Sequence, residues 1–252
     1  MKLTGFLFAA ALLGTCTQHA AEENYTRHVD PKIGTGGHGH VFVGANVPFG
    51  LVQVGPTSIP QTWDWCSGYH ASDSTVIGFS HTHLSGTGIG DLFDITVMPV
   101  VGEVTYARGE ENDPASGLWS YADRTREITK PGYYSVPLVR YGITAELTAT
   151  ERVGLHRYTF PASDAAAVVF DLENGGCWDK ATDTGFRFSD DSTRIAGWRC
   201  STGWAKNQEV YFVAEFSKPA KGISYLQPGE IDDSKMPRIA ARYARVDFDT
   251  AE

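Results

Sequence analysis

ITAELTAT, residues 143–150, alternates apolar and polar side chains without a break. The apolar residues are Ile143, Ala145, Leu147 and Ala149, and each is followed by Thr or Glu. Successive side chains of a strand point to opposite faces of a sheet, so a period of two predicts a strand with one buried face and one wet face. We therefore expect residues 143–150 to form a half-buried strand.

Similar segments, rich in Val, Ile and aromatic residues, recur about every ten residues on both sides of this strand. Polar or Gly- and Pro-bearing turns separate them, and no long segment has a helical period. We predict a mostly β chain: an antiparallel β-sandwich of two packed sheets with few helices. The expected strands are 51–54, 76–80, 95–101, 143–150, 153–160, 165–172, 186–188, 194–199, 210–216 and 243–248, and the run at 165–172 suits a central strand.

Three further segments lie outside these strands. Residues 25–34 are expected to enter an edge strand and then a Gly-rich loop at 34–39, which lacks the Gly-Lys-Ser/Thr ending of a phosphate-binding loop. Residues 108–116 favour an exposed loop. Residues 226–237 favour either a loop or an excursion at a sheet edge.

Composition is that of a soluble globular protein, with 42% apolar and 20% charged residues among 252. The formal net charge of -9 argues against a nucleic-acid partner.

Residues 1–21 resemble an export signal, with Lys2 before an apolar run and small residues at Ala20 and Ala21. A lipoprotein signal ending before Cys16 is the alternative. We expect an exported chain, periplasmic, secreted or lipid-anchored at the cell surface, with no transmembrane segment.

Export places the remaining cysteines in an oxidising compartment, where disulfides form. Cys177 and Cys200 flank an expected hairpin and are the favoured pair, although sequence alone does not fix the connectivity. Cys66 is expected to be a small buried apolar residue.

The chemistry-bearing residues concentrate between residues 33 and 90, a stretch dense in Gly, His and Trp with few charges. Gly allows close backbone approach, and Trp and His supply flat faces and hydrogen-bonding edges. We interpret the stretch as loops shaped around a polar ligand. Trp63 beside Asp64 suits a sugar, because an indole packs on the C–H face of a pyranose while a carboxylate accepts from its hydroxyls. The alternative places one of Trp63 and Trp65 in the core.

Two His-x-His pairs, His38 with His40 and His81 with His83, lie in the same stretch. Residues i and i+2 of a strand share a face, so either pair can chelate zinc or another transition metal. No Asp or Glu completes a ligand set at a recognisable interval. The competing interpretation is that these imidazoles bind sugar hydroxyls or hold the loops together.

Other charged residues favour structural roles. Asp91 and Asp94 could be a general acid and base, but their spacing of three favours turn and strand-start chemistry. The pairs at 151–152 and 156–157 are expected on the wet face of a sheet.

Three blocks carry a resemblance to a known family: HVDPKIGTGGHGHVFVGANVPFGLVQVGP, WDWCSGYHASDSTVIGFSHTHLSGTGIGDLFDITVMPV and PGYYSVPLVRYGITAELTATERVGLHRYTFP. They resemble the amino-terminal part of glycoside hydrolase family 92, whose members are exo-acting, inverting α-mannosidases. The match runs from about residue 28 to residue 160 and more loosely beyond.

The resemblance implies that residues 22–252 form the amino-terminal β-sandwich of a larger enzyme. In that family a C-terminal (α/α)6 barrel supplies the catalytic acid, the base and the calcium ligands, so we expect the calcium ligands outside this chain. We expect no catalytic residue within it, and the chain alone is expected to be inactive. Its expected partners are α-mannoside glycans and that catalytic domain.

The resemblance also implies that the sandwich contributes loops to the leaving-sugar side of the active site. The matching positions that we expect to bind substrate are Gly36, Gly37, His38, Trp63, Asp64, Cys66, Tyr69 and His83. Two alternatives stay open: a stand-alone carbohydrate-binding module, and a metal-dependent hydrolase that uses the His pairs.

Overall fold

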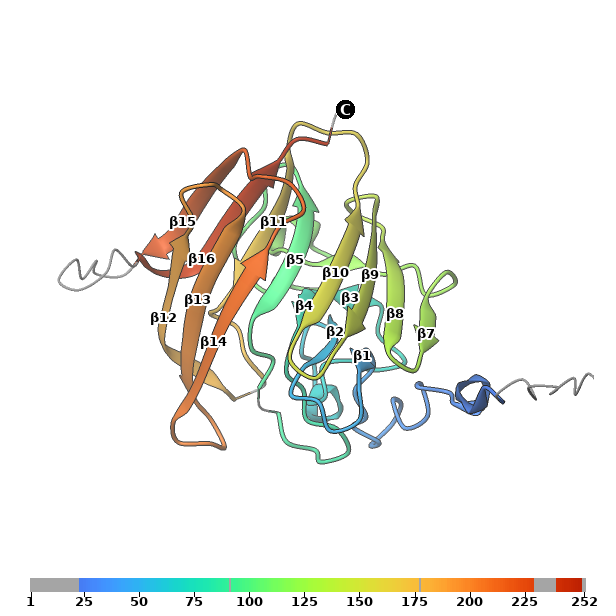
Figure 1. Cartoon of the computed structure of the whole chain (residues 1–252). Coiled ribbons are helices and arrows are strands. Elements are labelled where there is room, and N and C mark those ends of the chain that lie inside the picture. Colours follow the sequence, from blue (N-terminus) through green and yellow to red (C-terminus); the bar gives the residue numbers. More distant parts are fainter. Residues whose placement is uncertain (1–22, 91, 177, 229–238, 251–252) are drawn as a thin grey trace, which may run out of the picture.

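The computed structural model describes residues 23–90, 92–176, 178–228 and 239–250 (Figure 1). Strands dominate these ranges, and every strand pair in them is antiparallel. Helical structure in the same ranges is confined to three 3-10 turns: η1 (Tyr25–His28), η2 (Trp63–Trp65) and η3 (Pro114–Ser116). The predicted fold class, an antiparallel β-sandwich with few helices, is confirmed.

The larger sheet has ten strands. Nine follow one path: β1 (Ala45–Asn46), β2 (Gln53–Thr57), β4 (Gly78–Ser80), β5 (Thr96–Val101), β11 (Ala166–Asp171), β16 (Ile239–Phe248), β12 (Lys180–Phe188), β13 (Arg194–Thr202) and β14 (Gln208–Glu215). The tenth, β15 (Gly222–Pro228), also pairs with β16. The run expected to be a central strand is therefore central, because β11 lies between β5 and β16.

The second sheet has four strands, in the order β10 (Gly154–Thr159), β9 (Ile143–Ala149), β8 (Tyr133–Leu138) and β7 (Ile128–Lys130). A two-stranded ribbon, β3 (Thr75–Val76) with β6 (Ser120–Tyr121), completes the described sheets. The alternating stretch forms β9 as predicted: Ile143, Ala145 and Leu147 are fully buried, whereas the residues between them are partly or fully exposed.

The main core lies between the four-stranded sheet and the first half of the ten-stranded sheet. One side contributes Val54, Phe79 and Met98, and the other contributes Tyr134 and the buried face of β9. All these side chains are almost fully excluded from solvent. Burying a side chain of this size stabilises the fold by about 1.5–3 kcal/mol, so this core accounts for the face-to-face packing of the two sheets.

A second core forms because the ten-stranded sheet curls onto itself. Phe170 of β11 stacks on Phe212 of β14 with 5.7 Å between ring centroids, although β16, β12 and β13 separate the two strands in the sheet. Phe186 and Phe216 close the same cluster. Figure 1 shows β12, β13 and β14 standing to one side of β11 and β5. The sandwich is therefore asymmetric, with one sheet contributing to both cores.

Two local predictions were wrong. Residues 25–34 form η1 and a turn rather than an edge strand, because the Asn24 side chain caps the turn by accepting from the backbone N–H of Thr26. The strand expected at 51–54 begins at Gln53, because the N–H groups of Leu51 and Val52 donate to the carbonyl of Glu151 instead.

Other expectations fall partly outside the described residues. The export signal lies in residues 1–22, and most of the segment at 226–237 lies in residues 229–238. Cys177 is also outside them, whereas Cys200 on β13 forms no disulfide, so the expected pairing is not confirmed. Cys66 is buried as expected. In the described part of the chain, no helix has the length and apolar character needed to cross a membrane.

Candidate functional site

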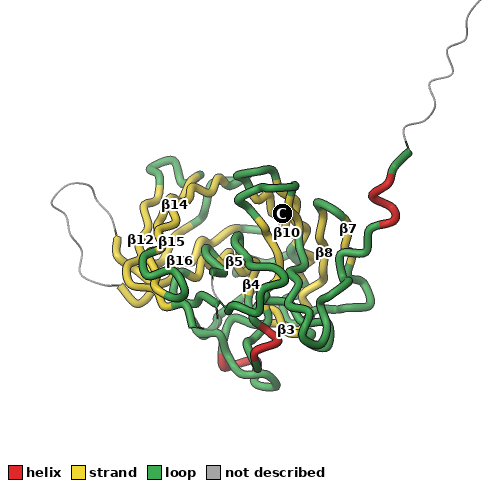
Figure 2. The backbone as a smooth tube through the Cα atoms, turned by 90° about the horizontal axis from the view of Figure 1, so that it is seen from below, coloured by secondary structure: helices red, strands yellow, loops and turns green. Residues whose placement is uncertain are grey.

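Three loops from distant parts of the sequence meet at one end of the sandwich: residues 34–40, 62–70 and 81–88. Seen from below the view of Figure 1, this end of the molecule consists largely of loops with short helical turns between them (Figure 2). These loops carry the residues that the sequence singled out. The stretch from 33 to 90 therefore does assemble into one surface.

Glycine allows the first loop to turn sharply. A Cβ atom at Gly39 would lie 2.0 Å from the carbonyl oxygen of Gly34 and clash with it. Only glycine, which has no Cβ, fits at this position. This turn leaves His38 exposed and directs His40 inward. The carbonyl of His40 then accepts from the backbone of Gly86 at 2.6 Å and from the Ser67 hydroxyl, so both other loops are tied to it.

Trp63 is the exposed aromatic side chain of the site. It is 55% exposed, and its indole N–H donates to the carbonyl of Gly88 at 2.7 Å. The edge of the His40 ring packs against the indole, with 4.2 Å between centroids. Gly88 has a positive φ, and a Cβ there would lie 2.7 Å from the indole. The indole is therefore held in place while much of its surface stays open to solvent.

Asp64 joins the two imidazoles of the first loop. Its Oδ1 lies 2.6 Å from Nδ1 of His38 and 3.2 Å from Nε2 of His40. The hydrogen bond from His38 holds the pKa of the Asp64 carboxyl below its usual range. The carboxylate is therefore charged at neutral pH, and it bonds to the two imidazoles that lie next to the Trp63 ring.

The remaining residues of the Trp-rich loop lie behind this surface. The indole N–H of Trp65 donates to Asp73 at 2.6 Å, and its ring stacks on His70 at 4.2 Å. Cys66 is buried, and so is Tyr69, whose hydroxyl donates to Glu127 at 3.1 Å. Burial raises the pKa of Tyr69. These side chains support the loop from within rather than line its surface.

His83 also lies beneath the surface. It is 2% exposed, its Nδ1 bonds to the carbonyl of Gln53 at 2.7 Å, and Phe42 and Phe93 flank its ring. Burial lowers its pKa to about 4, so the ring is neutral at pH 7. His83 therefore holds the loops together and does not converge with His81 on a common ligand.

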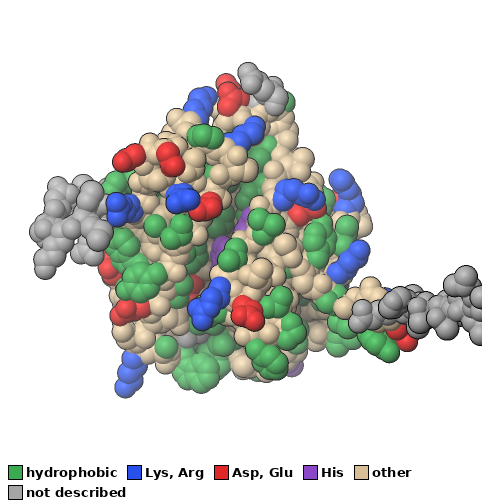
Figure 3. Space-filling view, in the orientation of Figure 1, with side chains coloured by type: hydrophobic (Ala, Val, Ile, Leu, Met, Phe, Trp, Pro, Cys, Tyr) green, Lys and Arg blue, Asp and Glu red, His purple; other side chains and the backbone are tan. Residues whose placement is uncertain are grey.

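His81 pairs instead with His156 of β10. Their Nε2 atoms lie 2.9 Å apart, so one ring donates and the other accepts, while Nδ1 of His81 bonds to the carbonyl of Ile95 and Nδ1 of His156 bonds to the Tyr158 hydroxyl. Figure 3 shows histidine side chains at the floor of a hollow between the two halves of the molecule.

The expectation that the pair at 156–157 lies on the wet face is wrong for its first member, because the side chains of β10 alternate and His156 shares the inward face with Tyr158. The pair at 151–152 lies in the turn before β10, not on a strand.

Asp94 has the structural role that its spacing favoured, in a form that the sequence did not reveal. It forms a fully buried ion pair with Arg199 of β13 at 2.8 Å, and the same guanidinium contacts Asp179. Thr82 and Gln208 donate to the other oxygen of Asp94. Asp91 lies outside the described residues.

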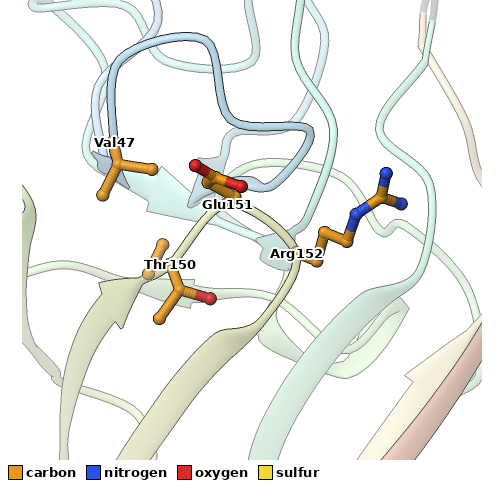
Figure 4. A pocket seen from close by; sticks show the side chains of 5 residues that line it. Val47, Thr150, Glu151 and Arg152 are labelled. Atoms are coloured by element: carbon orange, nitrogen blue, oxygen red, sulfur yellow. The ribbon is translucent and has the colours of Figure 1, made fainter.

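Two open hollows lie elsewhere on the surface. One, of about 540 Å³, lies between Val47 and the turn at Thr150, Glu151 and Arg152, where the Arg152 side chain points away from the other three (Figure 4). The other, of about 410 Å³, lies beside Trp178. Neither is lined by a histidine or contains the loops described above.

The structure thus divides the eight expected substrate-binding residues into two groups. Gly36, Gly37, His38, Trp63 and Asp64 lie at the loop surface, whereas Cys66, Tyr69 and His83 lie behind it. Two participants are absent from that set: His40, which bridges Trp63 and Asp64, and Gly88, which anchors the indole. The His-x-His spacing pointed to His40, but no sequence pattern pointed to Gly88.

An antiparallel sandwich with an exposed indole, a charged carboxylate and imidazoles on one loop surface has the features of a carbohydrate-active domain. Residues 28–252 match the model of the glycosyl hydrolase family 92 N-terminal domain. The chain belongs to this family, as the resemblance of its three sequence blocks implied.

Solved structures and a curated relative agree with this assignment. The chain shares 36% identity and a TM-score of 0.82 with the family GH92 α-mannosidase BT3965 from Bacteroides thetaiotaomicron in complex with mannoimidazole, across 89% of this chain and 30% of that one. It shares 27% identity and a TM-score of 0.73 with the GH92 glycosyl hydrolase ccman5, across 90% of this chain and 31% of that one. An uncharacterized secreted glycosidase from Arthroderma benhamiae is 31% identical over 148 residues, 57% of this chain.

The chain is short compared with these proteins. It spans about a third of the length of the solved structures and 18% of the fungal glycosidase. The likeness therefore covers only a part of each.

Proposed function

We propose that this chain is the amino-terminal sandwich of an exo-acting, inverting α-mannosidase, and that its Trp63 surface binds the leaving sugar. The observation that carries the proposal is the exposed indole held beside a charged carboxylate. Family membership and the similarity to an α-mannosidase that binds mannoimidazole support it. The secreted fungal relative supports export of the protein.

The chemistry of the surface suits a hexose. The open face of Trp63 offers apolar contact for the C–H face of a pyranose. Asp64 is ionised and accepts from vicinal hydroxyls, and exposed His38 offers a donor or an acceptor. Gly36 and Gly37 carry no side chain over this face, so a sugar can approach the backbone of the first loop.

The sandwich positions the sugar and does not catalyse its release. In an inverting glycosidase an acid and a base lie about 6.5–9.5 Å apart across the scissile bond, so that a water fits between them. We assign both groups to the C-terminal barrel of the longer protein. The role of this chain is to hold the leaving sugar in register with those groups, which lowers the entropic part of the barrier.

Calcium is expected in the complete enzyme, but the described residues do not fit it. Calcium takes about six to eight oxygen ligands. In the described ranges, the one cluster of three or more His, Cys, Asp and Glu side chains provides two imidazole nitrogens and a single carboxylate. The calcium ligands are therefore proposed to lie in the barrel.

The test compares two substrates of the full-length enzyme. Trp63→Ala should lower kcat/KM about 10- to 100-fold for an α-linked mannobiose, because loss of a well-placed aromatic contact costs about 1–3 kcal/mol. The effect on an aryl α-mannoside, whose leaving group is not a sugar, should be much smaller. Trp204→Ala, which removes another exposed indole, in the turn between β13 and β14, is the matched control.

An equal loss on both substrates would contradict a leaving-sugar role, and no loss on either would reject the surface altogether. The alternative function, a stand-alone carbohydrate-binding module, predicts a different pattern. The protein would bind mannosides in calorimetry, Trp63→Ala would abolish that binding, and no mannose would be released.

A further inference from the structure

His38, His40 and Asp64 place three metal-binding atoms close together. Nδ1 of His38, Nε2 of His40 and Oδ1 of Asp64 all lie within 4.8 Å of one another. Asp64 supplies the common point, at 2.6 Å from one nitrogen and 3.2 Å from the other. A tetrahedral first-row metal ion binds nitrogen and oxygen ligands at about 2.0–2.2 Å, so its ligand atoms lie about 3.3–3.6 Å from one another. The His40–Asp64 contact is close to this separation, and the exposed His38 ring would move outward by about 1 Å from its hydrogen bond to reach it.

The donor set selects the class of metal. Two imidazoles and one carboxylate suit zinc and other divalent first-row transition metals, whereas calcium and magnesium prefer oxygen ligands alone. Three protein ligands also leave a fourth position open. Here that position faces solvent, since the His38 side chain is 78% exposed.

The backbone holds the three groups before any ion arrives. His40 has a φ of 53°, in the left-handed region that non-glycine residues rarely adopt, and two hydrogen bonds to its carbonyl fix it there. Its ring is buried against Trp63. Asp64 belongs to the 3-10 turn that presents the same indole. An ion therefore meets two largely buried ligands and one exposed ligand, His38.

We propose that His38, His40 and Asp64 bind one divalent transition-metal ion of the zinc type, with an open coordination position at the solvent surface. The proposal depends on this geometry and not on the proposed sugar-binding role of the surface. The ion would occupy the carboxylate oxygen that a sugar hydroxyl would use, so zinc and mannoside would compete for the loop.

The other histidines of the described chain do not offer an equivalent site. His81 and His156 bond to each other, and their remaining nitrogens are engaged by Ile95 and Tyr158. His83 presents a single buried nitrogen, and no carboxylate accompanies it in a cluster.

The test is a zinc titration of the purified protein that carries this chain, without a polyhistidine tag and after treatment with a chelator. Calorimetry in the absence of sugar should show zinc binding that is lost or weakened at least 10-fold in His38→Ala and in Asp64→Asn. Even partners of metal ligands contribute about 10- to 100-fold to affinity, so removing a ligand should cost at least as much. His28→Ala, which removes an exposed histidine outside the cluster, is the control.

Cobalt gives a second readout, because a cobalt ion with nitrogen and oxygen ligands absorbs visible light and the spectrum should change in the same variants. His38 is exposed, so its replacement does not threaten folding. Equal zinc affinity in the wild type and both variants would overturn the proposal, and so would zinc binding that only His28→Ala weakens. Neither result would bear on sugar binding, which the mannobiose kinetics test separately.

Discussion

The loops of residues 33–90 and the strands of residues 143–216 hold their shape by different means. In the strands, neighbouring backbones bond to each other in register, and apolar faces pack inward. In the loops, hydrogen bonds from polar side chains to the backbone hold the segments together. Ser67 bonds to the backbone of His40, Trp63 to that of Gly88, and His83 to that of Gln53.

Because of this difference, different kinds of substitution should lower the stability of the two regions. A packed strand region loses stability mainly when side-chain volume is removed. A loop region fixed by buried polar groups loses it when one partner disappears or changes protonation, because the remaining group is left unsatisfied. Three measurements test whether the two regions differ in this way.

The largest effect is expected at Arg199, which joins the two regions. Its guanidinium is buried between Asp179 and Asp94, and Asp94 follows the loop region and accepts a hydrogen bond from Thr82 within it. Arg199→Met leaves two buried carboxylates without a counter-charge, so we expect a loss of about 3–5 kcal/mol in the free energy of unfolding. Denaturant titration followed by fluorescence measures this loss.

Arg194 provides the matched control on the same strand. It pairs with Glu215, and both side chains are mostly exposed. Arg194→Met should change the free energy of unfolding by less than about 1 kcal/mol. Equal effects of the two substitutions would mean that the Arg199 network does not tie the regions together.

The second effect probes the strand region alone. Leu147 on β9 is fully buried, whereas Leu155 on the adjacent strand β10 is mostly exposed. Leu147→Ala should lower the free energy of unfolding by about 3 kcal/mol through lost burial and the cavity that remains, and Leu155→Ala by about 0.5 kcal/mol or less. If both cost the same, the hairpin does not bury the face assigned here.

The smallest effect probes, through pH, two buried histidines of the loop region and His156, their neighbour on β10. Burial lowers the pKa values of His81, His83 and His156 in the folded protein, that of His83 to about 4. An unfolded histidine has a pKa near 6.5, so below that pH the unfolded state binds more protons and stability falls as pH falls. Between pH 7 and pH 5.5, His83 alone should cost about 1 kcal/mol.

Urea titrations at the two pH values measure this loss, and His83→Gln should reduce it because the new side chain does not titrate. A free energy of unfolding that is the same at pH 7 and pH 5.5 would contradict the buried, neutral state of these rings.

The strand region was largely predictable from sequence because its signal is local. The alternation at Ile143 to Ala149 fixes which face is buried, and the polar turn at residues 189–192 places the hairpin of β12 and β13. What the sequence could not show is the curl that stacks Phe170 on Phe212, because it depends on the accumulated twist of five strands.

The site was predictable in composition but not in pairing. The density of Gly, His and Trp marked the loops, and of the two Trp residues in this stretch Trp63 is exposed whereas Trp65 is partly buried. The acid that joins the first His-x-His pair is Asp64, 26 residues from His38, in another loop. Asp94 and Arg199 are 105 residues apart. No periodic pattern encodes such contacts, since only the folded backbone brings the residues together.

The position of β16 has a consequence for how the protein is made. This strand is the last described element in the chain, yet it lies between β11 and β12 in the middle of the larger sheet. Until a ribosome has synthesised residue 248, a nascent chain therefore holds three unjoined pieces of this sheet: one ends at the edge of β11, one ends at the edge of β12, and the third is β15, whose partner is β16. Exposed strand edges of this kind pair readily with other chains.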